Sequence, residues 1–357
     1  MFEYDGGLCI YQNTGEFLVG LNELGADVEN FHFREKLVKN YFMATFDVLK
    51  SGIRFTAIRK NRHKILAYLK AYYIGINRVL QNDFLYIFFP NSFSYLALTC
   101  ILLKKPYGVY IRGEMAFNKK TSRYIFKKAS IVLTVSPAFT DRVLRLGGNS
   151  ETIRPMIDFS SEDIVRNRKY LTKEKYQLLY LSRVEYPKGI ADLILAIDIM
   201  VKQELTCFLL TVVGSGPDME AIQVMIEELK LDNYVKLVGL VKEKELIRKY
   251  YSDADIFICP THHEGFPRVL YESMIFGTPI ITTMVGSIHY LMKDNYNCLS
   301  IQPRDPNGIA QKISSVIGNY PSIRKVANNA TITIEKYLEQ NKQTHSEHLF
   351  RKVKEAI

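Results

Sequence analysis

The stretch covering residues 254–287 does most to limit what this chain can fold into. It begins with an apolar run that ends in Pro260, and this pattern predicts a short buried strand. Pro267 suits the start of a helix but not its interior, so a helix is expected over residues 268–276. Gly-Thr-Pro then ends the helix, and a second apolar strand begins at residue 280. The stretch therefore predicts a βαβ unit, which binds ligands at the carboxyl ends of its strands.

The same alternation runs through the second half of the chain. Apolar runs of strand length alternate with longer segments of helical periodicity. The expected strands cover residues 176–181, 207–213 and 235–238, and the expected helices cover residues 190–201, 218–230 and 242–251. Strands that alternate with helices of this length predict a parallel, doubly wound α/β sheet.

Glu264 and Glu272 are the most informative polar residues of the βαβ unit. Seven residues separate them, so Glu264 is expected on the loop and Glu272 about a turn into the helix. Carboxylate oxygens accept hydrogen bonds from neighbouring sugar hydroxyls, and their charge strengthens these bonds. Taken alone, the pair fits a sugar site and fits equally well a solvated helix with two unrelated acids.

The complete run ADIFICPTHHEGFPRVLYESMIFGTPIITTMVGS resembles the donor-binding segment of retaining nucleotide-sugar glycosyltransferases of family 4, whose signature is the Glu-x7-Glu pair. The resemblance implies an α/β fold of the GT-B type, in which two Rossmann-like, doubly wound domains face each other across a cleft. It also implies that Glu272 binds the ribose hydroxyls and that Glu264 contacts the transferred sugar. The backbone of three further residues is expected to help fix that sugar: Gly265, Phe266 and Pro267.

Arg183 and Lys188 follow the strand expected at 176–181. The sequence Ser-Arg-x4-Lys-Gly places both cations at the head of a helix, where free N–H groups and the helix dipole already favour anions. In the resembled family such a pair binds the diphosphate of the donor and stabilises the leaving group, without a metal ion. We therefore expect no metal and no cofactor, with the nucleotide sugar as a substrate.

Gly214 and Gly216 lie in a Gly-Ser-Gly-Pro turn that lacks the third glycine of a dinucleotide fingerprint. The resemblance instead implies a tight turn whose backbone lies beside the nucleotide. The sequence Asp253-Ala254-Asp255 has the spacing of a DxD metal motif, but its place before an apolar strand favours capping and packing.

The first half of the chain resembles the family only in outline. Family members open with a strand and a Gly-Gly loop near the donor phosphates, which predicts this role for Gly6 and Gly7, with Gly15 in a rival loop. Many members also place a histidine near the reacting sugar. The corresponding strand here ends near Arg112 and Glu114, one of which is expected to face the reaction centre instead.

Length and composition allow two domains. A chain of 357 residues with 47% hydrophobic content can bury two cores. We assign residues 1–165 to an N-terminal acceptor-binding domain and residues 170–340 to a C-terminal donor-binding domain. The charged stretch 159–175 is the expected boundary. As in the resembled family, the segment 341–357 is expected to form a helix that crosses back to the first domain.

The net charge of +10 lies almost entirely in the first half. Residues 1–160 hold 22 Lys and Arg against 13 Asp and Glu, whereas residues 161–357 hold 25 against 24. Part of the excess lies in residues 54–78. Five apolar residues recur at helical spacing over residues 65–79: Ile65, Leu69, Tyr72, Ile76 and Val79. This pattern fits an amphipathic helix on an anionic bilayer, and it fits an ordinary surface helix with a solvated basic face. No nucleic-acid motif accompanies the charge.

Five scattered cysteines and an N-terminus without a signal-peptide pattern predict a cytoplasmic protein, with a peripheral place at the inner membrane face as an extension. The expected activity is retaining transfer of a sugar from a nucleotide sugar to a glycan or lipid-linked glycan, in envelope or capsular polysaccharide synthesis. The alternative is a sugar-nucleotide-binding protein of the same fold without catalysis. Donor hydrolysis separates the two, because only the enzyme releases nucleotide.

Overall fold

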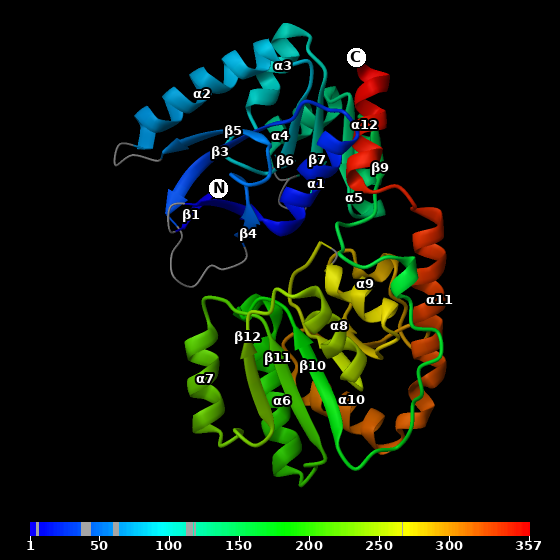
Figure 1. The fold of residues 1–357 in the computed structure, drawn as a ribbon. Helices are drawn as coiled ribbons and strands as arrows, with labels where there is room; N and C mark the ends of the chain where they lie inside the picture. The colour runs from blue at the N-terminus through cyan, green and yellow to red at the C-terminus, as the bar shows by residue number, and fades with distance from the viewer. Residues whose placement is uncertain (5–6, 37–43, 60–63, 112–116, 118, 266) are drawn as a thin grey trace. The chain divides into compact units, whose positions relative to one another are not determined.

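The computed structural model divides the chain into two compact units (Figure 1). Unit 1 comprises Met1–Met156 and Gln343–Ile357, and unit 2 comprises Ile157–Lys342. The segment 157–165, which we assigned to the N-terminal domain, belongs to unit 2 because its apolar side chains join a core of that unit. The structure describes all residues except 5–6, 37–43, 60–63, 112–116, 118 and 266.

Unit 2 contains a six-stranded sheet in the order β12-β11-β10-β13-β14-β15, and every neighbouring pair is parallel. Its strands are β10 (Tyr176–Leu181), β11 (Phe208–Val213), β12 (Val235–Gly239), β13 (Ile256–Cys259), β14 (Ile280–Thr283) and β15 (Leu299–Ile301). Its α-helices are α6 (Ile190–Lys202), α7 (Met219–Glu228), α8 (Lys244–Asp253), α9 (Arg268–Ile275), α10 (Pro306–Gly318) and α11 (Arg324–Gln340).

Both faces of this sheet are buried. Along β10, Leu178 and Tyr180 join the core formed with α6, α7 and α10, whereas Leu179 joins the core formed with α8 and α9. Successive side chains of a strand point to opposite faces, so a strand covered on both faces needs an apolar residue at almost every position. The apolar runs of the sequence meet this requirement, and the predicted parallel, doubly wound sheet is confirmed.

Unit 1 contains two sheets, in the orders β4-β2-β1-β3-β5 and β6-β7-β8-β9. The strands are β1 (Phe2–Tyr4), β2 (Gly7–Tyr11), β3 (Glu29–Lys36), β4 (Ala44–Asp47), β5 (Arg54–Arg59), β6 (Leu85–Phe89), β7 (Tyr107–Ile111), β8 (Ile131–Thr134) and β9 (Ser150–Thr152). The α-helices are α1 (Gln12–Glu23), α2 (Lys64–Gln81), α3 (Leu96–Leu103), α4 (Lys120–Lys128), α5 (Pro137–Arg145) and α12 (His345–Ala356).

Unit 1 begins with two paired strands, and Gly7 lies in the second of them. β1 pairs antiparallel with β2, and Tyr4 lies opposite Gly7, so Gly7 belongs to a strand. Gly15 lies inside α1, so the rival loop that we predicted there is wrong. A Cβ atom on Gly15 would lie 2.0 Å from the Phe46 ring, and this close packing accounts for a glycine in mid-helix.

The last helix, α12, belongs to unit 1. The Ser346 hydroxyl donates a hydrogen bond to the Phe17 carbonyl of α1 at 3.0 Å, and the His345 ring lies 2.6 Å from the Tyr86 hydroxyl of β6. The chain therefore returns to its first unit after completing its second. Among the described residues, no helix is both long enough and apolar enough to cross a membrane.

Candidate active site

The strand order of unit 2 singles out one edge of its sheet. The chain runs outward from β10 to β11 and β12, and then returns to add β13 on the other side of β10. The loops that follow β10 and β13 therefore diverge, and parallel sheets bind ligands at the carboxyl ends of strands at such a point. A recess lies there, lined by Tyr180, Leu181, Ser182, Lys188, Phe257, Ile258, Cys259, Thr261, Glu264 and Pro267.

Lys188 and Glu264 form an ion pair in this recess. Lys188 ends a short 3-10 helix, Tyr186–Lys188, directly before α6, and Glu264 lies on the loop after β13. The Lys188 Nζ atom lies 2.6 Å from Glu264 Oε2, and the two side chains are only 13% and 23% exposed. Two residues that were predicted to contact different parts of a ligand thus lie side by side, 76 positions apart in the sequence.

Arg183 lies on the loop between β10 and α6 and is more exposed. Its guanidinium forms a 2.8 Å ion pair with Glu185, and its carbonyl accepts a hydrogen bond from the buried Tyr180 hydroxyl at 2.9 Å. Tyr180 thereby fixes the backbone of the loop. The Arg183 side chain is 40% exposed, whereas its partner Glu185 is only 15% exposed, so the guanidinium is the part of this pair that a ligand can reach.

Glu272 is buried in α9. Its Oε2 atom accepts a hydrogen bond from the Tyr251 hydroxyl at 2.9 Å, and Tyr251 itself is completely buried. Burial raises the pKa of Glu272, and the charge of Arg268 and the Tyr251 hydrogen bond oppose this effect without cancelling it. The folded chain therefore keeps Glu272 buried although burial disfavours its charged form. Carboxyl groups with a pKa shifted in this way are common at functional sites.

Residues 161–333 match the model of the family described as Glycosyl transferases group 1. The matched residues make up just under half of the chain, and over them the second unit is similar to the group 1 glycosyl transferases. The matched segment contains every site residue predicted in unit 2. The family resemblance inferred from the Glu-x7-Glu run is thereby confirmed.

Two curated relatives show how far sequence similarity extends. The uncharacterized glycosyltransferase MJ1607 of Methanocaldococcus jannaschii is 26% identical over 220 residues, which cover 58% of this chain and 56% of that protein. The amylovoran biosynthesis glycosyltransferase AmsK of Erwinia amylovora is 27% identical over 208 residues, which cover 56% of this chain and 49% of that protein. The chain spans about half the length of the curated relatives it matches.

Structural similarity extends over the whole chain. The Anabaena protein Alr3699/HepE, crystallised with UDP and glucose, superposes with a TM-score of 0.67 at 16% identity and covers 96% of this chain and 98% of that chain. The chain thus has the GT-B fold that the sequence predicted.

The glycines of the loop after β11 have a packing role that the sequence did not reveal. A Cβ atom on Gly214, whose φ is +142°, would lie 1.9 Å from the Ser182 carbonyl oxygen. A Cβ atom on Gly216 would lie 2.2 Å from the Val184 carbonyl oxygen. Both glycines let this loop pack against the loop that carries Arg183. A place beside the nucleotide stays a prediction for both.

Gly286 and Ser287 support the Glu264 loop and were not among the predicted site residues. A Cβ atom on Gly286, whose φ is +59°, would lie 1.8 Å from the Glu264 carbonyl oxygen. The Ser287 backbone N–H donates a hydrogen bond to the Gly265 carbonyl at 3.0 Å. The sequence feature that could have pointed to this role is a glycine shortly after a predicted strand. Glycine often occurs where two backbones approach closely.

His262 connects the loop after β13 to α6 and to the segment directly before this helix. Its Nε2 atom lies 2.5 Å from Asp192 Oδ2, and its backbone N–H donates a hydrogen bond to the Pro187 carbonyl at 2.9 Å. These contacts hold together the two segments that carry Lys188 and Glu264. The contacts of His262 therefore join the two walls of the recess.

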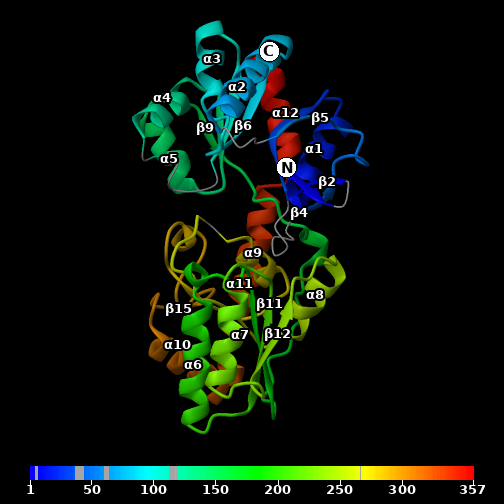
Figure 2. The same cartoon turned by 90° about the vertical axis from the view of Figure 1, so that its left-hand side faces the viewer.

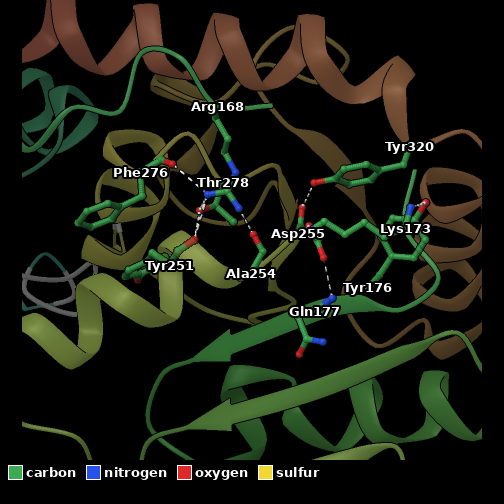
Figure 3. A network of polar contacts seen from close by, with 10 residues as sticks. All are labelled: Arg168, Lys173, Tyr176, Gln177, Tyr251, Ala254, Asp255, Phe276, Thr278 and Tyr320. Atoms are coloured by element: carbon green, nitrogen blue, oxygen red, sulfur yellow. Dashed lines mark hydrogen bonds and ion pairs between the residues drawn. The ribbon is translucent and has the colours of Figure 1, made fainter. Parts of the chain in front are cut away.

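Figure 3 shows a polar network in unit 2 around Arg168 and Asp255. Asp255 accepts hydrogen bonds from Lys173 Nζ at 2.6 Å and from the Gln177 backbone N–H at 2.8 Å, and it is almost completely buried. The second aspartate of the DxD sequence therefore ties the start of β13 to β10, the packing role that we predicted for it. Arg168 donates hydrogen bonds to Thr278 Oγ1 and to three carbonyls, those of Tyr251, Ala254 and Phe276.

Several predicted residues lie outside the described part of the chain: Gly6, Arg112, Glu114 and Phe266. Pro267 is described and forms the N-cap of α9, as its position before the helix predicted. The structure thus brings Lys188, Glu264 and Pro267 together in one recess.

Proposed function

We propose that the chain is a retaining glycosyltransferase that transfers a sugar from a nucleoside-diphosphate sugar. The observation that carries the proposal is the Lys188–Glu264 pair at the point where the strand order of the sheet reverses. A cation and a carboxylate side by side match a ligand with an anionic phosphate next to a neutral sugar. The structural neighbour bound to UDP and glucose makes UDP the first nucleotide to test.

In this proposal each charged residue binds one part of the donor. Arg183 and Lys188 bind the diphosphate and stabilise the charge that develops on it as the bond to the sugar breaks. Glu272 binds the ribose hydroxyls, and Glu264 binds the transferred sugar. Because the two cations stabilise the leaving group, the site needs no metal ion. Gly214, Gly216 and the 265–267 segment supply backbone beside the donor.

The proposed chemistry is a displacement on the same face of the sugar, as the family resemblance implies. The acceptor oxygen forms a bond to the anomeric carbon while the bond to the leaving phosphate breaks. The phosphate oxygen takes the proton of the acceptor hydroxyl, so the anomeric configuration is retained. We propose a glycan or lipid-linked glycan as acceptor and polysaccharide synthesis as the process; the AmsK relative is named for amylovoran biosynthesis.

The test is release of UDP from UDP-sugars by the native chain and by Arg183→Ala, with EDTA present. We expect turnover to fall by roughly 10²–10³-fold, the usual effect of removing one group that stabilises developing charge. Arg166→Ala is the control, because it also removes an arginine of this unit that forms an ion pair with a carboxylate, Glu335. Equal turnover of Arg183→Ala and the control would refute the phosphate assignment. Nucleotide binding without any release would favour the binding protein without catalysis.

A further inference from the structure

Helix α2 of unit 1 has two apolar faces, and only one of them is packed. The inner face contains four buried residues that pack toward the unit: Ala67, Ala71, Gly75 and Val79. The opposite face contains six apolar or aromatic residues that are between 38% and 77% exposed: Ile65, Leu66, Leu69, Tyr73, Ile76 and Leu80. We call these six residues the outer stripe. The five residues that suggested an amphipathic helix in the sequence are divided between the two faces, because Val79 is buried and Ile65, Leu69 and Ile76 are exposed.

The outer stripe is continuous along the helix. At about 100° of rotation per residue, its six members fall within an arc of roughly 100°, and the four buried residues lie on the other side. Lys70 lies at one edge of this arc and is exposed. Single exposed leucines are common on protein surfaces, but a contiguous apolar stripe over four turns of a helix marks an interaction site.

The positive charge of the first half is concentrated in the same part of the chain. Residues 64–128 hold eleven Lys and Arg against two Asp and Glu, a net charge of +9. Residues 1–63 hold eight of each, and residues 129–160 hold three of each. The segment that carries α2, α3 and α4 therefore accounts for the whole excess, and none of these three helices contains an acidic residue.

The neighbouring helices extend both properties of the stripe. α2 packs against α3, and α3 packs against α4, within unit 1 (Figure 2). Leu102 at the end of α3 is 82% exposed. On α4, Lys120, Lys127 and Lys128 are exposed. The outer stripe thus belongs to a group of three packed helices whose charged residues are all basic.

We propose that the outer stripe of α2 inserts into the interface of an anionic lipid bilayer, while lysines of α2 and of the nearby helix α4 bind the lipid phosphates. A helix that lies in a membrane interface buries one apolar face among the acyl chains and keeps basic groups near the anionic headgroups. The long lysine side chains reach the headgroups while their carbon stems stay in the apolar zone. The inference is independent of the proposed sugar transfer, because it rests only on residues of unit 1.

The charge pattern favours a lipid surface over a second copy of the chain. In a symmetric dimer through the outer stripe, α2 would lie against its own copy, and this helix contains three basic residues and no acidic one. Like charges in such an interface repel, whereas an anionic bilayer offers complementary charge over a large area.

The test is flotation of the full chain with vesicles of phosphatidylcholine alone and of equal parts phosphatidylcholine and phosphatidylglycerol. We expect the native chain to float with the anionic vesicles and much less with the neutral ones. The double variant Leu69→Glu/Ile76→Glu should bind the anionic vesicles roughly tenfold less, because two charges enter the inserted face. The matched control is Leu171→Glu/Val224→Glu, which alters two exposed apolar residues of unit 2 and should float like the native chain.

A charge variant separates the two parts of the proposal. Lys120→Gln/Lys127→Gln/Lys128→Gln should lower binding to anionic vesicles toward the level seen with neutral ones. Thermal unfolding of each variant establishes that it is folded, and Leu66→Ser/Leu69→Ser replaces the glutamate variant if that one is not. Native-like flotation of the stripe variants would overturn the proposal. So would self-association of the native chain in lipid-free buffer that the stripe variant abolishes, since this would identify a protein interface.

Discussion

Glu272→Gln separates a functional role of the buried carboxylate from a structural one. Burial raises the pKa of Glu272, so the charged form is disfavoured in the folded chain relative to the unfolded chain. The stability that this group contributes is present at acidic pH and is lost as the pH rises through its raised pKa. Glutamine has the same shape and still accepts the Tyr251 hydrogen bond, but it has no charge to desolvate. We therefore expect the variant to be at least as stable as the native chain at neutral pH.

The expected effect on nucleotide binding has the opposite sign. A hydrogen bond to a charged acceptor contributes roughly 1.5–3 kcal/mol, and one to a neutral acceptor contributes about 0.5–1.5 kcal/mol. If the carboxylate binds the two ribose hydroxyls, losing its charge weakens binding by roughly 2–3 kcal/mol, which is about 30–150-fold in Kd.

Two measurements check this prediction. Thermal unfolding from pH 4 to pH 8, at steps of about one pH unit, should show a smaller loss of stability with rising pH in Glu272→Gln than in the native chain. Calorimetric titration with UDP should show weaker binding by the variant. Glu228→Gln, at an exposed position of α7, is the control and should change neither quantity. A variant that is less stable than the native chain and binds UDP equally well would refute the reasoning, because Glu272 would then be a structural residue.

Two further predictions concern the residues that support the site. Gly286→Ala should destabilise the chain by roughly 2–4 kcal/mol and weaken nucleotide binding, because the new Cβ atom meets the Glu264 carbonyl at a positive φ. Gly318→Ala, where a Cβ atom has open space, is the control, and equal melting temperatures of the two variants would contradict the close approach. Arg168→Ala should cost about 3–5 kcal/mol in thermal unfolding, because it leaves several acceptors without their donor. Arg166→Ala should cost less than about 1 kcal/mol, as an exposed ion pair does, and a similar loss in both would refute the role of the Arg168 network.

The second half of the fold could be predicted because its local signals agree. The strands of unit 2 are apolar at nearly every position, and glycines and prolines mark the ends of its helices. The hydrophobic periodicity and the helix-ending residues therefore predict the same elements. The first half could not be predicted equally well. Its opening strands form an antiparallel pair, and α1 runs through Gly15, a residue that local propensity places in a loop. The Phe46 ring, whose close contact explains the glycine at position 15, is distant in the sequence.

The identity of the candidate site residues was predictable, but their contacts were not. The Glu-x7-Glu spacing and the loop cations predict Glu264, Glu272, Arg183 and Lys188 as site residues without any structure. That Lys188 pairs with Glu264, and that Glu272 accepts a hydrogen bond from Tyr251, depends on how the loops after different strands approach one another. The exposure of the outer stripe of α2 could likewise not be predicted from the sequence. Both faces of this helix are apolar, so the sequence does not show which face packs against the unit.

Thermal unfolding of the native chain with UDP, GDP and ADP, in EDTA and then in Mg²⁺, tests the central claim most directly. The account predicts that one diphosphate raises the melting temperature equally with and without metal. A ligand at 100 times its Kd adds about 2.7 kcal/mol, which is about 5–10 °C for a domain of this size. The shift should be smaller in Lys188→Ala. No shift with any diphosphate, or a shift only when Mg²⁺ is present, would contradict a metal-independent donor site built on Arg183, Lys188 and Glu272.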